Sequence, residues 1–92
     1  MRENIIKDKT FGFAVRIVNL NHYLVEKKKE YIISKQILRS GISIGANVEE
    51  ADGGISKADF SNKISIAYKE AKETHYWLRL LSATNYIFQK DV

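Results

Sequence analysis

The sequence predicts an all-α fold, a single antiparallel up-and-down helical bundle over residues 1–92. Apolar residues recur at alternating steps of three and four, which is the period of an amphipathic helix and not of a strand. No proline occurs in the 92 residues, so nothing forces these helices to break. Short charged or glycine-containing stretches separate the periodic segments. The predicted helices span about 10–28, 33–52 and 57–84.

The composition is that of a globular domain, with 45% hydrophobic and 28% charged residues. A core built from 92 residues is thin, and zero cysteines exclude disulfides and thiolate ligands, so we expect self-association. The net charge of +4 permits binding to nucleic acid without requiring it. Apolar runs reach only three residues, as at 31–33, which predicts no membrane span or signal peptide and a cytoplasmic protein.

The first predicted helix carries one apolar stripe with a polar member near its middle, flanked by Ile17 and Leu24. The stripe consists of Phe11, Ala14, Val18, Asn21, Val25 and Lys28. A buried asparagine in such a stripe sets the register between helices, and this is the role expected for Asn21. The charged stretch 26–30 predicts the end of the helix and a solvated connection.

The second predicted helix carries two apolar stripes about 100° apart. Together they are too wide to be covered by a single neighbouring helix. They are formed by Ile33, Ile37, Gly41, Ile44, Val48 and Ala51, and by Leu38, Ile42 and Gly45. Each glycine costs about 0.5–1 kcal/mol relative to alanine, which indicates that another backbone approaches closely. Asp52-Gly53-Gly54 predicts a helix end with a glycine in the left-handed conformation.

The third predicted helix begins at a capping sequence, in which Ser56 precedes Asp59 by three residues. Its main stripe is Phe60, Ile64, Ala67, Ala71, Thr74 and Leu78. His75 lies near this stripe, where a hydrogen-bonded structural histidine is expected. Asn85 is a suitable left-handed terminator, after which residues 86–88 are expected to fold back over the helix end.

Three motifs in order resemble the bacterial four-helix-bundle proteins called 23S rRNA intervening-sequence proteins. They are an Arg-Ser-x-x-Ser-Ile-x-x-Asn-x-x-Glu-Ala core at 39–51, a Ser-Lys-x-x-Phe helix start at 56–60, and a Glu-x-x-Glu-Thr-x-Tyr-Trp-Leu stretch at 70–78. The resemblance extends upstream through Phe11, Ala14 and Ile17, so it covers nearly the whole chain.

The resemblance implies an antiparallel bundle that assembles into a ring-like homopentamer, with no established enzymatic activity. The family's name describes genes that lie inside intervening sequences of 23S rRNA genes. A basic, nucleic-acid-binding relative makes RNA or DNA the expected partner. Family members continue into a fourth helix, whereas only residues 88–92 remain here. The resemblance therefore predicts a cut-short chain or a missing helix, with an apolar groove left open between the first and third helices.

Polar residues on one side of the second helix allow two interpretations. They are Arg39, Ser43, Asn47 and Glu50. Arg39, Ser43 and Asn47 are compatible with a phosphate or ligand site, but a structural interface is favoured, because charged groups in packed interfaces more often set register. Arg39 and Glu50 lie about 16 Å apart along a helix, so each needs a partner elsewhere. We expect Glu70 or Glu73 to meet Arg39 across a helix pair or a subunit boundary.

Metal binding and catalysis are both disfavoured. A di-metal site in a bundle needs Glu-x-x-His on two helices, and here no glutamate precedes a histidine by three residues. His22 and His75 are the only imidazoles, and neither belongs to a recognised catalytic spacing. We therefore predict no catalytic residue, metal, cofactor, membrane contact or small-molecule substrate.

The best candidate for a functional surface is a basic arc on the third helix, about 100° wide. Its candidate nucleic-acid-binding residues are Tyr68, Lys69, Lys72, Tyr76 and Arg79, with Ser65 beside them. Cations meet phosphates and tyrosine rings stack on unpaired bases, although a solvated lysine face is the ordinary alternative. The favoured function is a non-enzymatic, self-associating RNA-binding protein. The alternative is an assembly module that recruits a protein through Ile66, Trp77 and Leu80.

Overall fold

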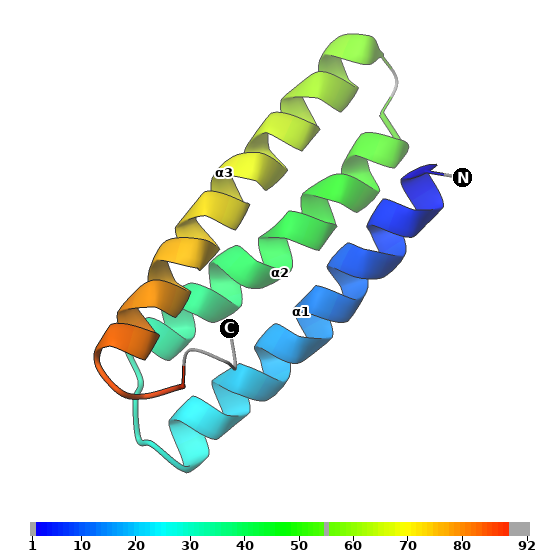
Figure 1. Ribbon diagram of the computed structural model, residues 1–92. Coiled ribbons are helices and arrows are strands. Elements are labelled where there is room, and N and C mark those ends of the chain that lie inside the picture. Colours follow the sequence, from blue (N-terminus) through cyan, green and yellow to red (C-terminus); the bar gives the residue numbers. More distant parts are fainter. Residues whose placement is uncertain (1, 55, 89–92) are drawn as a thin grey trace.

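The computed structural model describes residues 2–54 and 56–88, which form three antiparallel α-helices in an elongated arrangement of 43 × 20 × 20 Å (Figure 1). Helix α1 spans Arg2–Glu26, α2 spans Ile33–Asp52 and α3 spans Lys57–Ala83. Helix α2 lies between the other two and packs against both of them. The predicted all-α bundle is confirmed, and the predicted range of the second helix is that of α2.

Helix α1 begins about two turns earlier than the predicted residue 10, and it ends at Glu26 instead of residue 28. Its first turns lie against the end of α2, where the Lys7 ammonium is 3.0 Å from the Asp52 carboxylate and 3.7 Å from that of Glu49. These contacts raise the pKa of Lys7, first through its hydrogen bond to Asp52. The apolar stripe of 10–28 gave no sign of this polar contact.

The side of α1 that faces the core also differs from the predicted stripe. Ile17 and Leu24, predicted only to flank it, are fully buried, whereas Phe11 is 68% exposed and Lys28 is exposed. Asn21 is half-buried and donates a hydrogen bond from Nδ2 to the carbonyl of Ser34, 3.0 Å away. The chain therefore buries the edge of the predicted stripe and leaves its other edge, around Phe11 and Val15, toward solvent.

Glycines let α1 and α2 approach each other closely. A Cβ atom on Gly41 would lie 2.8 Å from both Cγ atoms of Ile17. A Cβ on Gly45 would lie 3.3 Å from the backbone oxygen of Thr10. The close approach of another backbone is confirmed at Gly45, whereas Gly41 makes room for the side chain of Ile17, which becomes buried although it lies outside the predicted stripe.

The connection between α1 and α2 is solvated at residues 27–29, as predicted, and it ends in a cap that the sequence did not predict. The Glu30 carboxylate is buried and accepts hydrogen bonds from the backbone N–H groups of Ile32, Ile33 and Ser34, at 3.2, 3.0 and 2.7 Å. Lys29 before it turns with a positive φ of 56°. The negative charge thus satisfies the donors that the first turn of α2 leaves free, where the helix dipole also favours it.

The connection between α2 and α3 agrees with the prediction at the start of α3 and differs from it at the end of α2. Ser56 caps α3 as expected, since its Oγ accepts a hydrogen bond from the backbone N–H of Asp59 at 3.0 Å. The left-handed glycine predicted at the end of α2 is wrong, because Gly53 has a φ of −89°. Close packing explains Gly54 instead, since a Cβ there would lie 3.1 Å from the carbonyl oxygen of Ala51.

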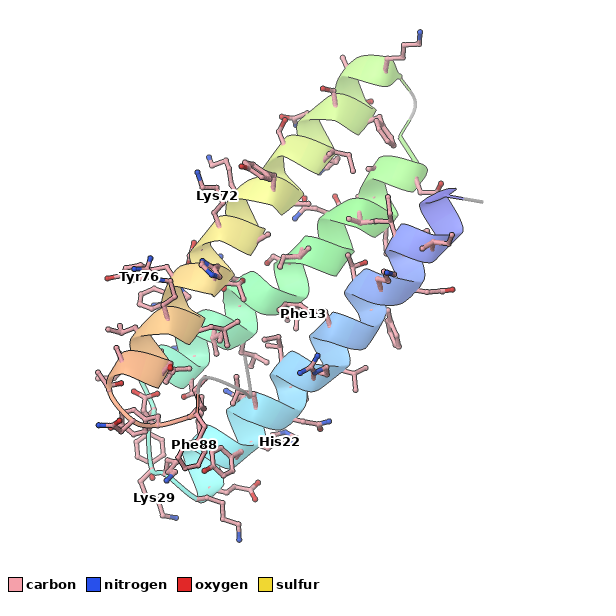
Figure 2. The ribbon with its side chains drawn as sticks, viewed as in Figure 1. Phe13, His22, Lys29, Lys72, Tyr76 and Phe88 are labelled. Atoms are coloured by element: carbon pink, nitrogen blue, oxygen red, sulfur yellow. The ribbon has the colours of Figure 1, made fainter. Side chains whose placement is uncertain are left out.

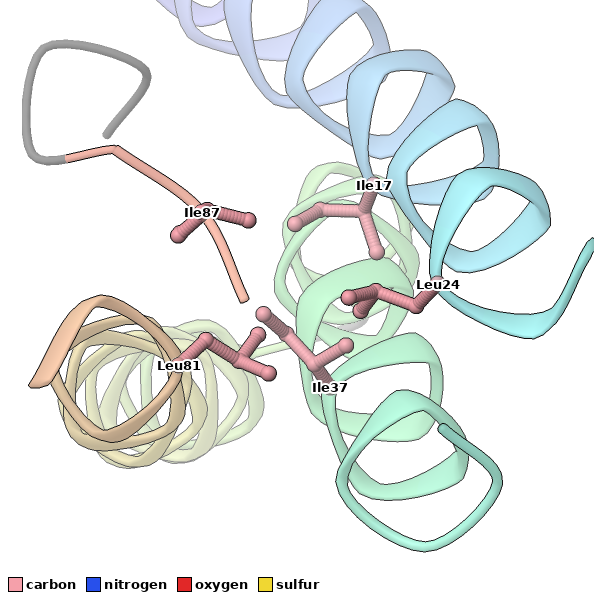
Figure 3. Close-up of a cluster of buried hydrophobic side chains, with 5 residues drawn as sticks. All are labelled: Ile17, Leu24, Ile37, Leu81 and Ile87. Carbon is pink, nitrogen blue, oxygen red and sulfur yellow. The ribbon is translucent and has the colours of Figure 1, made fainter. Parts of the chain in front are cut away.

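The main cluster of buried apolar side chains lies toward the end of the molecule where α1 ends, α2 begins and α3 ends, at the lower left of Figure 1. Figure 3 shows it at close range. Asn85 ends α3 with a φ of 69°, and the backbone N–H of Tyr86 donates to the carbonyl of Leu81 at 2.9 Å. Both features were expected of a left-handed terminator. The following Ile87 turns back and is buried among Ile17, Leu24, Ile37 and Leu81.

Helix α2 lies beside both α1 and α3, and Ile87 lies in the space between α1 and α3 (Figure 3). Near the opposite end, a small cavity of about 30 Å³ separates the first turns of α1 and α3. It is lined by Ile6, Lys7, Val48, Asp52, Phe60 and Ile64. Residues 89–92, on which the expected absence of a fourth helix rests, lie outside the described residues. Over the described part of the chain, no helix has an apolar stretch long enough to cross a bilayer.

Candidate nucleic-acid interface

The basic residues predicted as a binding surface lie together on the side of α3 that points away from α2. Thr74 marks the α2 side, since it is buried and its Oγ1 lies 2.8 Å from the Ser40 Oγ. Lys72 and Tyr76 are two residues to either side of it, about 200° around the helix. Figure 2 shows both side chains directed away from α1 and α2. We call this surface the outer face of α3; it comprises Tyr68, Lys69, Lys72, Tyr76 and Arg79.

The cations of the outer face are not neutralised within the described chain. Lys69, Lys72 and Arg79 are exposed and form no ion pair there, and the arc between them contains no acidic residue. Other cations do have partners; for example, the Lys63 ammonium lies 2.7 Å from the Glu50 carboxylate. The outer face therefore presents positive charge that is available to an external anion.

The two tyrosines of the outer face have different surroundings. Tyr68 is 66% exposed, and the Lys72 ammonium lies 5.6 Å above its ring centroid in a cation–π contact. Tyr76 is 54% exposed, and its ring packs edge-to-face on Trp77 with the centroids 5.2 Å apart and an interplanar angle of 71°. An open hollow surrounds Tyr76, lined by Ala71, Lys72, His75, Tyr76 and Arg79.

Behind Tyr76, a polar network links α3 to α2. The indole Nε1 of Trp77 donates to the Glu73 carboxylate at 3.0 Å, and Arg39 from α2 donates to the same carboxylate. A second nitrogen of Arg39 lies 3.1 Å from the Glu70 carboxylate. Arg39 thus meets both candidate glutamates across the α2–α3 helix pair within one chain, which is the first of the two arrangements that the sequence left open.

This network fixes the charge of its members. The hydrogen bond from Trp77, followed by that from Arg39, lowers the pKa of Glu73. The hydrogen bond to Glu73 is also the main reason why the pKa of Arg39 is raised. Glu73 is therefore ionised, and it is held on the side of Trp77 instead of on the outer face, where its charge would oppose a bound anion.

The remaining polar residues of α2 make local contacts. Ser43 Oγ donates to the carbonyl of Arg39 at 2.7 Å, and Asn47 Nδ2 donates to the carbonyl of Ser43 at 2.8 Å. These bonds occupy the groups that a ligand site made of Arg39, Ser43 and Asn47 would need. The contacts of the side chains therefore resemble those of a structural interface.

The two histidines lie on different helices, His22 on α1 and His75 on α3. His75 is exposed and lines the hollow beside Tyr76, so the structural role predicted from its nearness to the main stripe is wrong. The position is about 100° from Thr74, enough to leave the buried side of α3. His22 is exposed on α1. Among the described residues, no group of three or more metal-ligating side chains is present.

The apolar residues of the alternative protein-binding surface are only half-exposed. Ile66, Trp77 and Leu80 are each partly buried. Trp77 packs against the core cluster and uses its indole N–H within the chain. More exposed apolar side chains lie elsewhere, for example Phe11 and Val15 on α1 and Ile42 on α2.

Comparison with known proteins places the chain in a family without assigning it an activity. Residues 2–92 match the family described as 23S rRNA-intervening sequence protein. A crystal structure from Bacteroides thetaiotaomicron, of a protein with unknown function from the S23 ribosomal protein family, superposes with a TM-score of 0.96. The two sequences are 59% identical over 98% of this chain and 80% of that chain. No curated protein matches.

Proposed function

The chain belongs to the 23S rRNA-intervening sequence protein family, and from this premise we propose that it is a non-enzymatic cytoplasmic protein that binds RNA, or another nucleic acid, through the outer face of α3. The observation that carries the proposal is the set of exposed cations, Lys69, Lys72 and Arg79, without ion-pair partners in the described chain. Such cations release counterions when they meet phosphates, which drives binding.

The surroundings of the outer face favour an anion over other ligands. Glu70 and Glu73, the acidic residues nearest to it along α3, pair with Arg39 on the other side of the helix. Tyr68 and Tyr76 add exposed rings between the cations, the combination that binds single-stranded nucleic acid in many proteins. None of the three cations has an ion-pair partner in the described chain that would need to be displaced, and the Lys72 ammonium lies over the Tyr68 ring.

Charge reversal on the outer face tests the proposal. The Lys69→Glu/Lys72→Glu/Arg79→Glu variant is expected to lose RNA binding in a gel-shift titration. Its matched control is Lys9→Glu/Lys35→Glu/Lys57→Glu, which makes the same change in net charge at exposed positions away from the outer face. The wild-type affinity should fall with salt at a slope of about −2 for three phosphate contacts to a single strand. Equal loss in both triple variants, or no loss in the first, would refute the assignment.

Self-association is the second part of the proposal. Phe11, Val15 and Ile42 are 68%, 46% and 40% exposed, and exposed apolar side chains of this kind can be buried against another protein surface. A homo-oligomer, for which the resemblance implies a pentamer, would cover it and repeat the outer face around the assembly. Light scattering of the native particle with and without nuclease measures the mass and any bound nucleic acid; a monomeric mass would contradict this part.

A protein-binding assembly module remains the alternative function, supported by the partial exposure of Ile66, Trp77 and Leu80. The two functions differ in their response to salt, because apolar contacts persist where phosphate contacts are screened. A defined protein partner that is recovered in high salt, and lost on Leu80→Glu, would favour the alternative. Binding that disappears with salt and with the outer-face cations would favour RNA.

A further inference from the structure

We propose that the hollow around Tyr76 is a site for one unpaired nucleotide, whose base stacks on the Tyr76 ring while its phosphate lies between Lys72 and Arg79. The inference rests on the proposed function and makes it more specific: the protein should select single strands over duplexes of the same charge. Five side chains line the hollow, and all of them come from α3. Three of these, Lys72, His75 and Arg79, are nitrogen-bearing groups that suit a phosphate.

The two exposed tyrosines are not equivalent as stacking surfaces. The ring of Tyr68 already carries the Lys72 ammonium, 5.6 Å from its centroid. Tyr76 touches Trp77 in an edge-to-face contact, an arrangement that leaves at least one face of the Tyr76 ring open. Tyr76 is 54% exposed and lines the hollow, whereas Tyr68 does not line it. Tyr76 is therefore the stacking residue, and Tyr68 is a positioning residue that holds the Lys72 ammonium on the outer face.

The support behind Tyr76 makes the surface rigid. Trp77 is partly buried against the core cluster, and its indole donates to Glu73 at 3.0 Å. Glu73 is in turn bound by Arg39 of α2. A ring held by such a chain of contacts loses little conformational freedom when a base stacks on it, which favours binding.

The positions of Lys72, Tyr76 and Arg79 suit one unpaired nucleotide and not the surface of an RNA duplex. Lys72 and Arg79 lie about one helical turn before and after Tyr76, and both line the hollow. A phosphate next to a base on the Tyr76 ring would meet Arg79 and would draw the Lys72 ammonium from its contact with Tyr68. In an A-form duplex the bases are already stacked and paired, so their faces are not accessible to Tyr76. A duplex is left with the phosphate contacts alone.

The test compares two RNA probes, a short oligouridylate and a duplex with the same number of phosphates. The wild-type protein is expected to bind the oligouridylate more tightly. Tyr76→Ala should weaken oligouridylate binding roughly 5- to 150-fold, the range of one lost base–aromatic stack, and leave duplex binding unchanged. Tyr68→Ala, the matched control, should weaken binding of both probes by about two- to fivefold through Lys72. Tyr76→Phe keeps the ring and should bind like the wild type.

Intrinsic fluorescence gives a second readout that does not depend on affinity alone. Trp77 is the only tryptophan in the sequence and contacts Tyr76 directly. Its emission should change saturably as oligouridylate is added, and this change should disappear in Tyr76→Leu even where charge-driven binding persists. The Leu variant keeps apolar bulk on Trp77, and a circular dichroism melt shows whether it is folded.

The outcomes separate this inference from the proposed function. If the wild type binds neither probe, both are wrong. If the protein binds RNA through its outer-face cations but does not distinguish the two probes, the nucleotide site is wrong and the proposed function stands. The nucleotide site is equally wrong if Tyr76→Ala weakens duplex and single-strand binding to the same extent.

Discussion

The two faces of α3 differ in almost every physical respect although they belong to one continuous helix. The face toward α2 buries Thr74 and Leu81 at 1% and 0% exposure. The outer face instead presents Lys69, Lys72 and Arg79 to solvent without ion-pair partners in the described chain. Stability is therefore carried by one side of α3 and the proposed RNA binding by the other, so substitutions should change one property without the other.

The largest effect is expected from Leu81→Ala on the buried face. Leu81 contacts the core at the point where α1, α2 and Ile87 converge, so truncation leaves a cavity. The free energy of unfolding should fall by about 2–5 kcal/mol, measured by urea denaturation. The milder Leu81→Met should cost less than about 1.5 kcal/mol. RNA affinity per folded molecule should not change; a large loss of affinity would break the separation of the two faces.

A smaller loss is expected from Thr74→Val. This change keeps the shape of the side chain but removes the partner of the Ser40 hydroxyl, which is fully buried. Leaving that hydroxyl unsatisfied should lower the free energy of unfolding by about 1–3 kcal/mol. Adding Ser40→Ala to Thr74→Val should restore part of the loss, and a double-mutant cycle measures it. Strict additivity of the two changes would show that the hydroxyl pair does not couple the helices.

At the border between the faces, Glu73→Gln should have a modest effect that depends on pH. The pKa of Glu73 is lowered in the folded protein by its bonds to Trp77 and Arg39. Its stabilisation is therefore fully present above the unfolded pKa, and it is lost as the pH falls through the folded pKa. The pair is partly exposed and screened, so the loss near neutral pH should stay below about 1 kcal/mol.

Thermal melts from neutral pH down to about pH 3 check this expectation. The wild type should lose more stability than Glu73→Gln over the acidic range below the usual glutamate pKa of 4.5, and the two curves should converge there. A glutamine still accepts the indole hydrogen bond, so only the charge is removed. Parallel curves over the whole range would mean that the charge of Glu73 does not stabilise the fold.

The smallest effect on stability is expected on the outer face itself. Lys69→Ala and Arg79→Ala remove exposed side chains that have no ion-pair partner in the described chain. The free energy of unfolding should stay within about 0.5 kcal/mol of the wild type, as is usual for such positions. Each variant should nevertheless weaken RNA binding and reduce its salt dependence. A loss of stability comparable with that of Thr74→Val would mean that these side chains stabilise the fold instead of serving the proposed binding surface.

Much of the architecture follows from local sequence signals. The helical period predicted three helices, and Ser56 and Asn85 fixed where α3 begins and ends. The spacing of Gly41 and Gly45 predicted a close approach of another backbone, which the contact of Gly45 with Thr10 confirms. Such signals are reliable because capping bonds, backbone conformation and the period of a helix act over a few residues.

The candidate site was predictable in its position but not in its internal contacts. Helical spacing alone places Lys72, Tyr76 and Arg79 on one arc. It does not show that Lys72 covers Tyr68, that Trp77 supports Tyr76, or that His75 is exposed beside them. These facts depend on side-chain conformations, which the neighbouring helix and the core decide.

The sequence by itself determined the helices, their order and the residues shared by each face, because these are properties of single segments. Only the tertiary structure decided which edge of α1 is buried, since Ile17 and not Phe11 fits against Gly41 of α2. It also decided that Glu30, one charge among several in its stretch, caps α2. The physical reason is that burial depends on the shape of the surface a residue meets, and that surface belongs to another segment of the chain.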